Sequence, residues 1–187
     1  MDRNELTSKA AAALANDISA SMGDIAAKIG VSRTTLHRNF SSSAELKGEV
    51  ARFAVQETRR IFDEAGIDDR PARDALESIG DEVLALATAQ HLLWADPPIA
   101  NVAGLLEQAI AEGERLVRFA ARGQQEGVFR VDVPAAVLSF SICSQAFAML
   151  YAVSAGYVGE RAVKELFLAI CYGGLQGQAS NDRVVSV

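Results

Sequence analysis

The residues of this chain that could do chemistry are gathered in one short polar segment near the N-terminus. Directly after Ser32 come basic, hydroxyl and amide side chains, which are Arg33, Thr34, Thr35, His37, Arg38 and Asn39. Hydroxyl and imidazole groups hydrogen-bond phosphate oxygens, and arginine reaches guanine edges in the major groove of DNA. This composition is typical of a helix that reads DNA, although exposed arginines are also often only solvated surface charges.

Other kinds of chemistry find little support in the sequence. The chain has two histidines, and it shows no Ser/His/Asp arrangement, no H-E-x-x-H pattern and no Gly-rich phosphate loop after a strand. Its two cysteines, Cys143 and Cys171, lie far apart in apolar stretches without C-x-x-C spacing, so we expect buried thiols. We therefore expect no enzyme activity, no cofactor and no metal site.

Charge is distributed unevenly along the chain. The net charge of −6 at first argues against nucleic acid as a partner. Residues 1–60, however, hold nine Lys/Arg and seven Asp/Glu, whereas residues 61–187 hold nine and seventeen. Because a polyanion meets one face of a protein and not its average, any nucleic-acid site belongs at the N-terminus.

The residues around the polar segment predict two short helices joined by a tight turn. Ser21 with Asp24 is typical of a helix N-cap with a carboxylate in the first turn. Gly30 suits the left-handed position that ends this helix, and Ser32 can cap the next one. Leu36 then faces inward while the basic and hydroxyl residues face outward. Two such helices form a helix-turn-helix, which is also found in all-α proteins that do not bind DNA.

The rest of the chain carries apolar residues at helical spacing and no sustained alternation, which predicts an all-α protein. With 187 residues, half of them apolar, it can bury one good core or one core and a small satellite. The expected helices are residues 3–15, 44–65, 71 to the break at Asp96, 99–122, 134–154 and 160–176. Unbroken apolar stretches are short and the start lacks the apolar core of a signal peptide, so we expect a cytoplasmic protein with no membrane partner.

The segment IAAKIGVSRTTLHRNFSSSAEL resembles the DNA-binding motif of TetR-family transcriptional regulators, which typically reads I-A-x-x-x-G-V-S-x-x-T-L-Y-x-x-F-x-x-K-x-x-L. The matching positions are Ile25, Ala26, Gly30, Val31, Ser32, Thr35, Leu36, Phe40 and Leu46. The chain departs from the pattern at His37, where the family has Tyr, and at Ser43, where it has Lys; Lys47 lies one turn further on and can take its place. The resemblance assigns Thr35 and His37 to phosphates, Arg33, Thr34 and Arg38 to the groove, and Asn39 to either.

The resemblance further implies a helix-turn-helix domain over residues 1–47 and a ligand-binding and dimerisation domain over residues 48–187. The residues expected to line a pocket for a small apolar ligand are Gln90, His91, Trp94, Phe119, Gln145 and Met149. Phe119 and Met149 also fit a plain apolar core, and His91 also fits a side chain satisfied by a backbone carbonyl.

The last two predicted helices are strongly apolar, and we expect them to form a homodimer by pairing about a twofold axis into a four-helix bundle. The expected interface residues are Phe140, Phe147, Tyr151, Val163, Phe167, Ile170 and Gly174. These faces could instead cover only the chain's own core. The sequence thus predicts a regulator, in the first place a repressor, that binds a palindromic DNA operator as a homodimer and is released by an apolar small molecule. The alternative is a helical small-molecule-binding or adaptor protein with a weakened DNA-binding motif.

Overall fold

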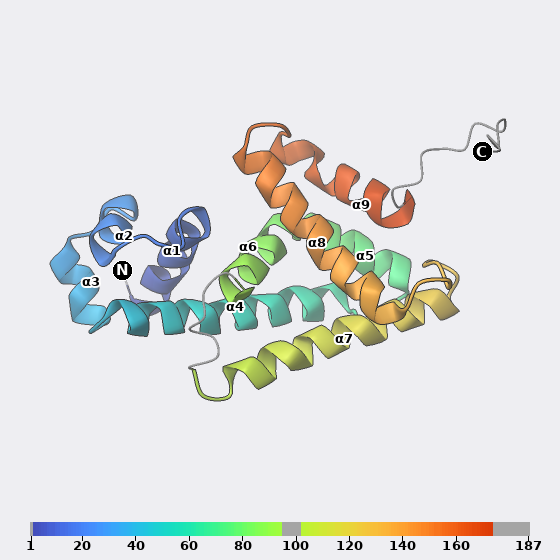
Figure 1. The fold of residues 1–187 in the computed structure, drawn as a ribbon, viewed down its shortest axis with the longest axis horizontal. Coiled ribbons are helices and arrows are strands. Elements are labelled where there is room, and N and C mark those ends of the chain that lie inside the picture. The colour runs from blue at the N-terminus through green and yellow to red at the C-terminus, as the bar shows by residue number, and fades with distance from the viewer. Residues whose placement is uncertain (1, 95–101, 174–187) are drawn as a thin grey trace, which may run out of the picture.

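A computed structural model describes residues 2–94 and 102–173, and within these ranges the chain is helical and contains no strand (Figure 1). The predicted all-α fold class is therefore confirmed. The elements in chain order are α1 (Arg3–Asn16), α2 (Met22–Lys28), α3 (Arg33–Asn39), α4 (Ser43–Ala65), α5 (Ala72–Asp81), α6 (Val83–Trp94), α7 (Leu105–Gln125), α8 (Ala135–Ser154), the 3-10 helix η2 (Glu160–Ala162) and α9 (Val163–Gly173).

The long helix α4 connects the two parts of the fold. Helices α1, α2 and α3 lie together at one end of the molecule beside the start of α4, and α4 continues from there with α6 above it and α7 below it, packing against α5, α6 and α7 (Figure 1). The expected division after residue 47 falls inside this unbroken helix. The two predicted domains thus share one helix, and the division itself stays a prediction.

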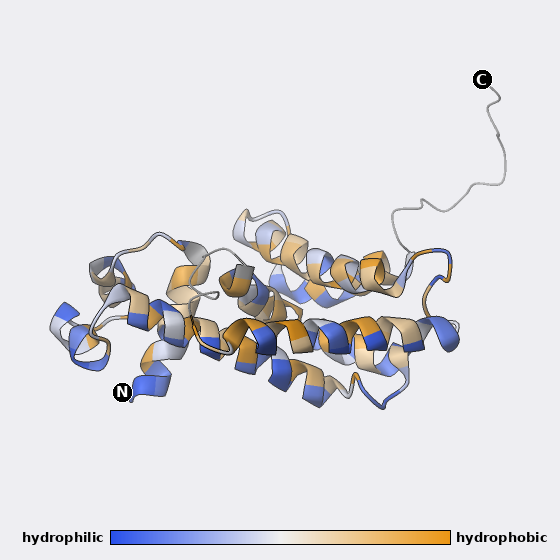
Figure 2. Ribbon diagram, turned by 60° about the horizontal axis from the view of Figure 1, so that its bottom comes forward, coloured by the Kyte–Doolittle hydropathy of each residue, from blue (hydrophilic) through white to orange (hydrophobic). Residues whose placement is uncertain are grey.

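Two clusters of buried apolar residues hold the helices together. The first joins α1, α2, α3 and the start of α4, and it also takes in Leu93 at the end of α6 and Leu105 at the start of α7. The second joins the end of α4 with α5 to α9, around Phe62, Leu76 and Phe167. Hydrophobic and hydrophilic residues alternate along the long helices, as expected of amphipathic helices around a core (Figure 2). The N-terminal helices therefore pack on the same elements that build the larger bundle.

Three predicted helix boundaries were wrong. The single helix expected from residue 71 is two helices, because the backbone at Glu82 leaves the helical conformation between α5 and α6. The helix expected from residue 99 begins at Leu105, after Gly104 in the left-handed region at φ +71°. The last helix starts as the η2 turn and becomes α-helical at Val163. Its expected end at residue 176 lies outside the described residues.

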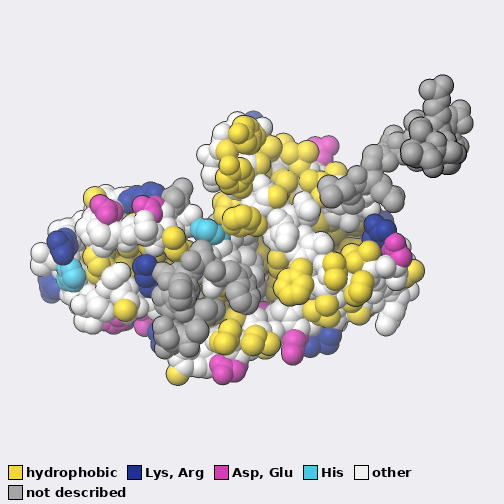
Figure 3. Space-filling model, in the orientation of Figure 1, with side chains coloured by type: hydrophobic (Ala, Val, Ile, Leu, Met, Phe, Trp, Pro, Cys, Tyr) yellow, Lys and Arg dark blue, Asp and Glu magenta, His cyan; other side chains and the backbone are white. Residues whose placement is uncertain are grey.

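The sequence predicts no apolar segment long enough to cross a membrane, but α8 is such a segment by its length and composition. By length and composition alone, α8 could cross a bilayer, and it contains no Asp, Glu, Lys or Arg. Core helices of globular proteins pass the same test, and here α8 packs against α6, α7 and α9. Its remaining face exposes aromatic side chains, and hydrophobic side chains gather there (Figure 3).

Candidate DNA-binding face and ligand cavity

The turn between α2 and α3 has the geometry that the sequence predicts. Ser21 and Asp24 form a reciprocal capping box, in which the Asp24 backbone N–H donates to Ser21 Oγ and the Ser21 backbone N–H donates to the Asp24 carboxylate. Gly30 adopts φ +75°, a left-handed conformation that other residues rarely take. The Val31 backbone N–H closes the turn on the Ala26 carbonyl at 3.0 Å. The predicted cap and turn are therefore confirmed.

Helix α3 is fixed from its inner side. Ser32 caps it, because the Thr35 backbone N–H donates to Ser32 Oγ at 3.0 Å. Leu36 and the following Phe40 are fully buried in the first apolar cluster. With these contacts made inward, the rotation of α3 about its axis is set, and the other side chains face solvent.

The outward residues of α3 are those that the sequence assigns to DNA. Arg33, Thr34, Thr35, His37 and Arg38 are exposed, whereas Asn39 is half-buried and donates to the Thr35 carbonyl at 2.9 Å. Basic and histidine side chains are visible at this end of the molecule (Figure 3). Residues 25–44 contain no Asp or Glu, so this face carries no acidic side chain of its own. The role of each side chain on DNA stays a prediction.

Two further contacts involve the outward residues of α3. Arg33 Nε donates to His37 Nε2 at 3.4 Å, so the two side chains lie along one side of α3. The Thr35 hydroxyl lies 2.8 Å from the Ser32 hydroxyl, which ties it to the helix cap. Lys47, the expected substitute for the family lysine at the position of Ser43, lies in the second turn of α4 and is half-buried.

Arg3 is a positioning residue that the sequence does not reveal. Its guanidinium donates to the Asn39 carbonyl at the end of α3 and to Glu45 of α4 at 2.8 Å, and it lies 4.7 Å from the centre of the Phe40 ring. These contacts join α1 to the end of α3 and the start of α4. Because the partners lie 36 and 42 residues away, no local pattern announces them.

Glu45 is the anion on which these contacts meet. The Ser41 hydroxyl and backbone N–H donate to one carboxylate oxygen at 2.6 and 2.7 Å, and Arg3 donates to the other. Hydrogen bonding from Ser41, followed by that from Arg3, lowers the pKa of Glu45 to about 2. The ionised carboxylate therefore stabilises the junction of α1, α3 and α4.

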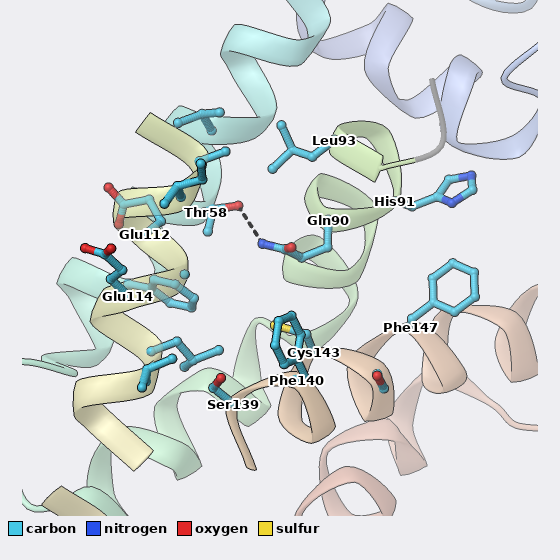
Figure 4. Close-up of a pocket in the computed structure, with 18 residues that line it drawn as sticks. Thr58, Gln90, His91, Leu93, Glu112, Glu114, Ser139, Phe140, Cys143 and Phe147 are labelled. Atoms are coloured by element: carbon cyan, nitrogen blue, oxygen red, sulfur yellow. Dashed lines mark hydrogen bonds between the residues drawn. The ribbon is translucent and has the colours of Figure 1, made fainter. Parts of the chain in front are cut away.

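A cavity of about 750 Å³ lies between α4, α6, α7 and α8 (Figure 4). This volume is in the range of sites for small organic molecules. Most of the wall is apolar. The lining residues are Val55, Thr58, Phe62, Gln90, His91, Leu93, Ala109, Ile110, Glu112, Gly113, Glu114, Leu116, Val117, Ser139, Phe140, Cys143, Ser144 and Phe147.

The structure brings only some of the expected pocket residues to this cavity. Gln90 and His91 line it. Phe119 and Met149 are instead buried in the second apolar cluster, where the Phe119 ring packs edge-on against Phe129. Gln145 is half-buried and lies off the lining. The side chain of Trp94 lies outside the described residues.

Sequence reasoning missed several lining residues because it assigned the exposed face of α8 to a dimer interface alone. Phe140 and Phe147, which were expected at a dimer interface, also line the cavity together with Cys143, at the helical spacing of one face. The residues that point into the core are one step away on the helix, at Ile142 and Ala146. Burial raises the pKa of the Cys143 thiol to about 11, so this group is an ordinary apolar wall residue at neutral pH.

Glu112 is the buried charge in the cavity wall, with 4% of its surface exposed. Arg59 Nε of α4 donates to one carboxylate oxygen and Arg115 Nη1 of α7 donates to the other, both at 2.7 Å. Arg115 also donates to Asp63 and Asp68. A buried carboxylate needs such partners, and here one of them ties the cavity helix α7 to α4.

The residues expected at a dimer interface divide into exposed and buried groups. Phe140, Phe147 and Tyr151 of α8 are exposed, with 72%, 45% and 65% of their surface accessible. Val163 and Phe167 of α9 are buried in this chain's own core, so their side chains do not form a free surface. Ile170 is half-buried against the same core, and Gly174 lies outside the described residues.

Comparison with solved structures finds the same fold in transcriptional regulators. The TetR-like regulator LfrR from Mycobacterium smegmatis, solved in complex with proflavine, has a TM-score of 0.73 and 21% identity, over 94% of this chain and 96% of that one. The ketosteroid regulator KstR2 of Mycobacterium tuberculosis has a TM-score of 0.69 and 20% identity, over 92% and 93%. PfmR, a TetR-family regulator from Thermus thermophilus, has a TM-score of 0.62 and 19% identity, over 95% and 98%.

At the level of sequence, no protein-family model and no curated protein matches the chain. The likeness is therefore one of fold: this chain folds over nearly its whole length as TetR-family transcriptional regulators do. It confirms the predicted arrangement of an N-terminal helix-turn-helix followed by a helical bundle.

Proposed function

We propose that this protein is a ligand-responsive transcriptional regulator that binds a palindromic DNA operator as a homodimer. The observation that carries the proposal is the exposed face of α3, where Arg33, His37 and Arg38 stand outward on a helix locked by Leu36 and Phe40. A helix of this kind enters the major groove, where arginine reads guanine and hydroxyls bind phosphate.

Dimerisation is supported by the surface of α8. This helix has no charged residue, and it exposes Phe140, Phe147 and Tyr151 on one side. A second copy would remove these side chains from water without placing like charges together. Two recognition helices set about one DNA turn apart would then read two half-sites, which one short helix cannot do alone.

Response to a ligand is supported by the cavity and by its connection to α4. A molecule in the cavity contacts Thr58 of α4 and the wall beside Glu112, while the N-terminal end of the same α4 packs on the DNA-binding helices. A ligand that binds one arrangement of α4 more tightly would shift the equilibrium toward that arrangement and so change the spacing of the recognition helices. The free energy of this shift cannot exceed the difference between the ligand's binding free energies for the two arrangements. The neighbour LfrR holds proflavine in its solved complex, which is consistent with such a site. We propose that the DNA-bound protein represses transcription and that ligand binding relieves this repression.

The competing function is that of a helical small-molecule-binding or adaptor protein. Ser43 in place of the family lysine and the overall charge of −6 favour it, since both weaken attraction to phosphate. The cavity serves either function equally well, so only DNA binding separates the two.

The experiment is a selection of duplexes from a random pool with the purified protein, at two salt concentrations. A regulator recovers a palindrome whose binding weakens as salt rises. For substitutions of the arginines on α3, such as Arg38→Ala, the matched control is Arg161→Ala, which removes an exposed arginine from η2, far along the chain from α3. Recovery of no sequence above the starting pool would leave the small-molecule-binding function as the better account.

A further inference from the structure

The charged groups of the cavity wall are all of one sign. Among the described lining residues there is no Lys or Arg. The two acidic residues are Glu112 and Glu114, both on α7. An anionic ligand that entered the cavity would meet apolar walls and no positive partner, and the transfer of an unpaired charge into such a site is strongly unfavourable.

The acidic residues are not available to a cationic ligand either. Both carboxylate oxygens of Glu112 already accept from Arg59 and Arg115. Glu114 is exposed, so water reduces the effect of its charge. Figure 4 shows both carboxylates turned away from Gln90, which reaches toward α4 from the opposite wall. Among the described lining residues there is therefore no free basic group, and the carboxylate of Glu114 is exposed to water and turned away from Gln90.

Uncharged polar groups are present inside the cavity. Thr58 donates its hydroxyl hydrogen to the Ala54 carbonyl at 3.0 Å, and Gln90 Nε2 donates to the Thr58 hydroxyl at 3.4 Å (Figure 4). The second bond is long and therefore weak. A carboxamide both donates and accepts, and can satisfy one hydroxyl or carbonyl group of a ligand.

We propose that the cavity selects uncharged, mainly apolar molecules that carry a single hydrogen-bonding group, and that Gln90 binds this group beside Thr58. Phe62, Phe140 and Phe147 contact the apolar body of the ligand. Charged amphiphiles of either sign bind less well, because their head groups stay at the cavity mouth and give up the contact with Gln90. This inference rests on the proposed function, since it assigns the ligand class of the proposed regulatory cavity.

The test is a displacement assay that needs no DNA. Uncharged N-phenyl-naphthylamine, which fluoresces in apolar sites, is bound to the full chain at pH 8. Decanol, decanoate and decylammonium, which share one chain length and differ in charge, then compete with it. Decanol should displace the probe at a concentration at least ~10-fold lower than either ion. Each ion loses the hydrogen bond to Gln90 and also buries its alkyl group less completely, and the two losses add.

Two variants should each raise the affinity of the cavity for one of the two charged competitors. Glu112→Gln leaves the guanidinium groups of Arg59 and Arg115 without that carboxylate, so decanoate should gain affinity. Arg59→Gln frees one Glu112 oxygen, so decylammonium should gain affinity. Glu107→Gln makes the same change as the first variant at an exposed position of α7 off the lining, and it should leave all three affinities unchanged. Gln90→Leu should weaken decanol about fivefold relative to the probe.

The outcomes separate this inference from the proposed function. Decanoate or decylammonium competing as well as decanol would overturn the ligand class, and so would failure of the probe to bind at all. Selectivity for decanol together with no DNA binding would retain the ligand class and remove the regulator. If Glu112→Gln does not fold, as judged by circular dichroism, the gain of decylammonium affinity in Arg59→Gln still decides the matter.

Discussion

Arg59 of α4 donates to Glu112 of α7 at 2.7 Å, and this pair joins the wall of the cavity to the helix that begins beside the helix-turn-helix. Glu112 is almost fully buried while Arg59 is partly exposed, so the pair combines a buried carboxylate with a guanidinium that water still reaches. We expect a displacement of α7 at the cavity to move α4 through this contact.

Removal of Arg59 should destabilise the fold. In Arg59→Met the buried Glu112 keeps only Arg115 as a partner, and we expect a loss of about 1–2 kcal/mol in the free energy of unfolding. The double variant Arg59→Met/Glu112→Leu should recover most of this loss, because Arg115 retains Asp63 and Asp68. Urea denaturation measures both values. Equal losses in the single and double variants would show that the pair contributes through packing alone.

Arg38 and Thr35 should affect DNA binding in different ways. Arg38→Ala should weaken binding to the selected operator by about 1–3 kcal/mol and relax the base preference, since arginine contacts guanine edges. Thr35→Ala should weaken specific and non-specific DNA alike, in part because its hydroxyl contacts the cap residue Ser32. Repeated duplex selection measures this. An unchanged base preference in Arg38→Ala would refute its place in the groove.

The dimer surface can be separated from the core by two glutamate substitutions. Tyr151→Glu places a charge on the exposed face of α8 outside the cavity lining, and it should give folded monomers at micromolar concentration. Phe167→Glu should unfold the chain, because Phe167 is fully buried within one subunit. Tyr157→Glu, at an exposed position beyond α8, is the control. Light scattering that finds the wild type monomeric would contradict the proposed interface.

Stability at low pH should depend on Glu45. Its pKa lies at about 2 in the folded chain, below the ordinary value of 4.5. The stabilisation from its hydrogen bonds is therefore complete above pH 4.5 and is lost as the pH falls toward 2. In Glu45→Gln the free energy of unfolding should fall less steeply over this window than in wild type. Parallel curves for the two proteins would show that Glu45 contributes nothing to acid sensitivity; Glu107→Gln serves as the matched control.

The helix-turn-helix could be predicted from sequence because its signals are local. Ser21 and Asp24 are three residues apart, and a glycine at position 30 by itself indicates a left-handed backbone conformation. The cavity could not be predicted in the same way. Its lining depends on how α8 packs, with Ile142 in the core and Phe140 exposed beside the cavity, and the uniformly apolar sequence of that helix does not define an inner face.

The same reasoning explains the charged contacts that sequence analysis missed. Arg59 and Glu112 are 53 residues apart, and Arg3 and Glu45 are 42 apart. From the sequence alone, these charged residues cannot be distinguished from solvated surface residues. Their contacts become evident only from the packing of α1, α4 and α7. The error at α9 has a related cause, since Val163 and Phe167 face α5 and the core of the same chain and not a second copy.

The measurement that tests the account most directly is the fluorescence anisotropy of the selected duplex with the full chain, before and after decanol is added. We predict tight binding that weakens with salt, release of the duplex by decanol, and a need for a higher decanol concentration in Gln90→Leu. Binding of the selected duplex no tighter than a scrambled one, or operator binding that decanol leaves unchanged while it displaces the fluorescent probe, would contradict a regulator controlled through this cavity.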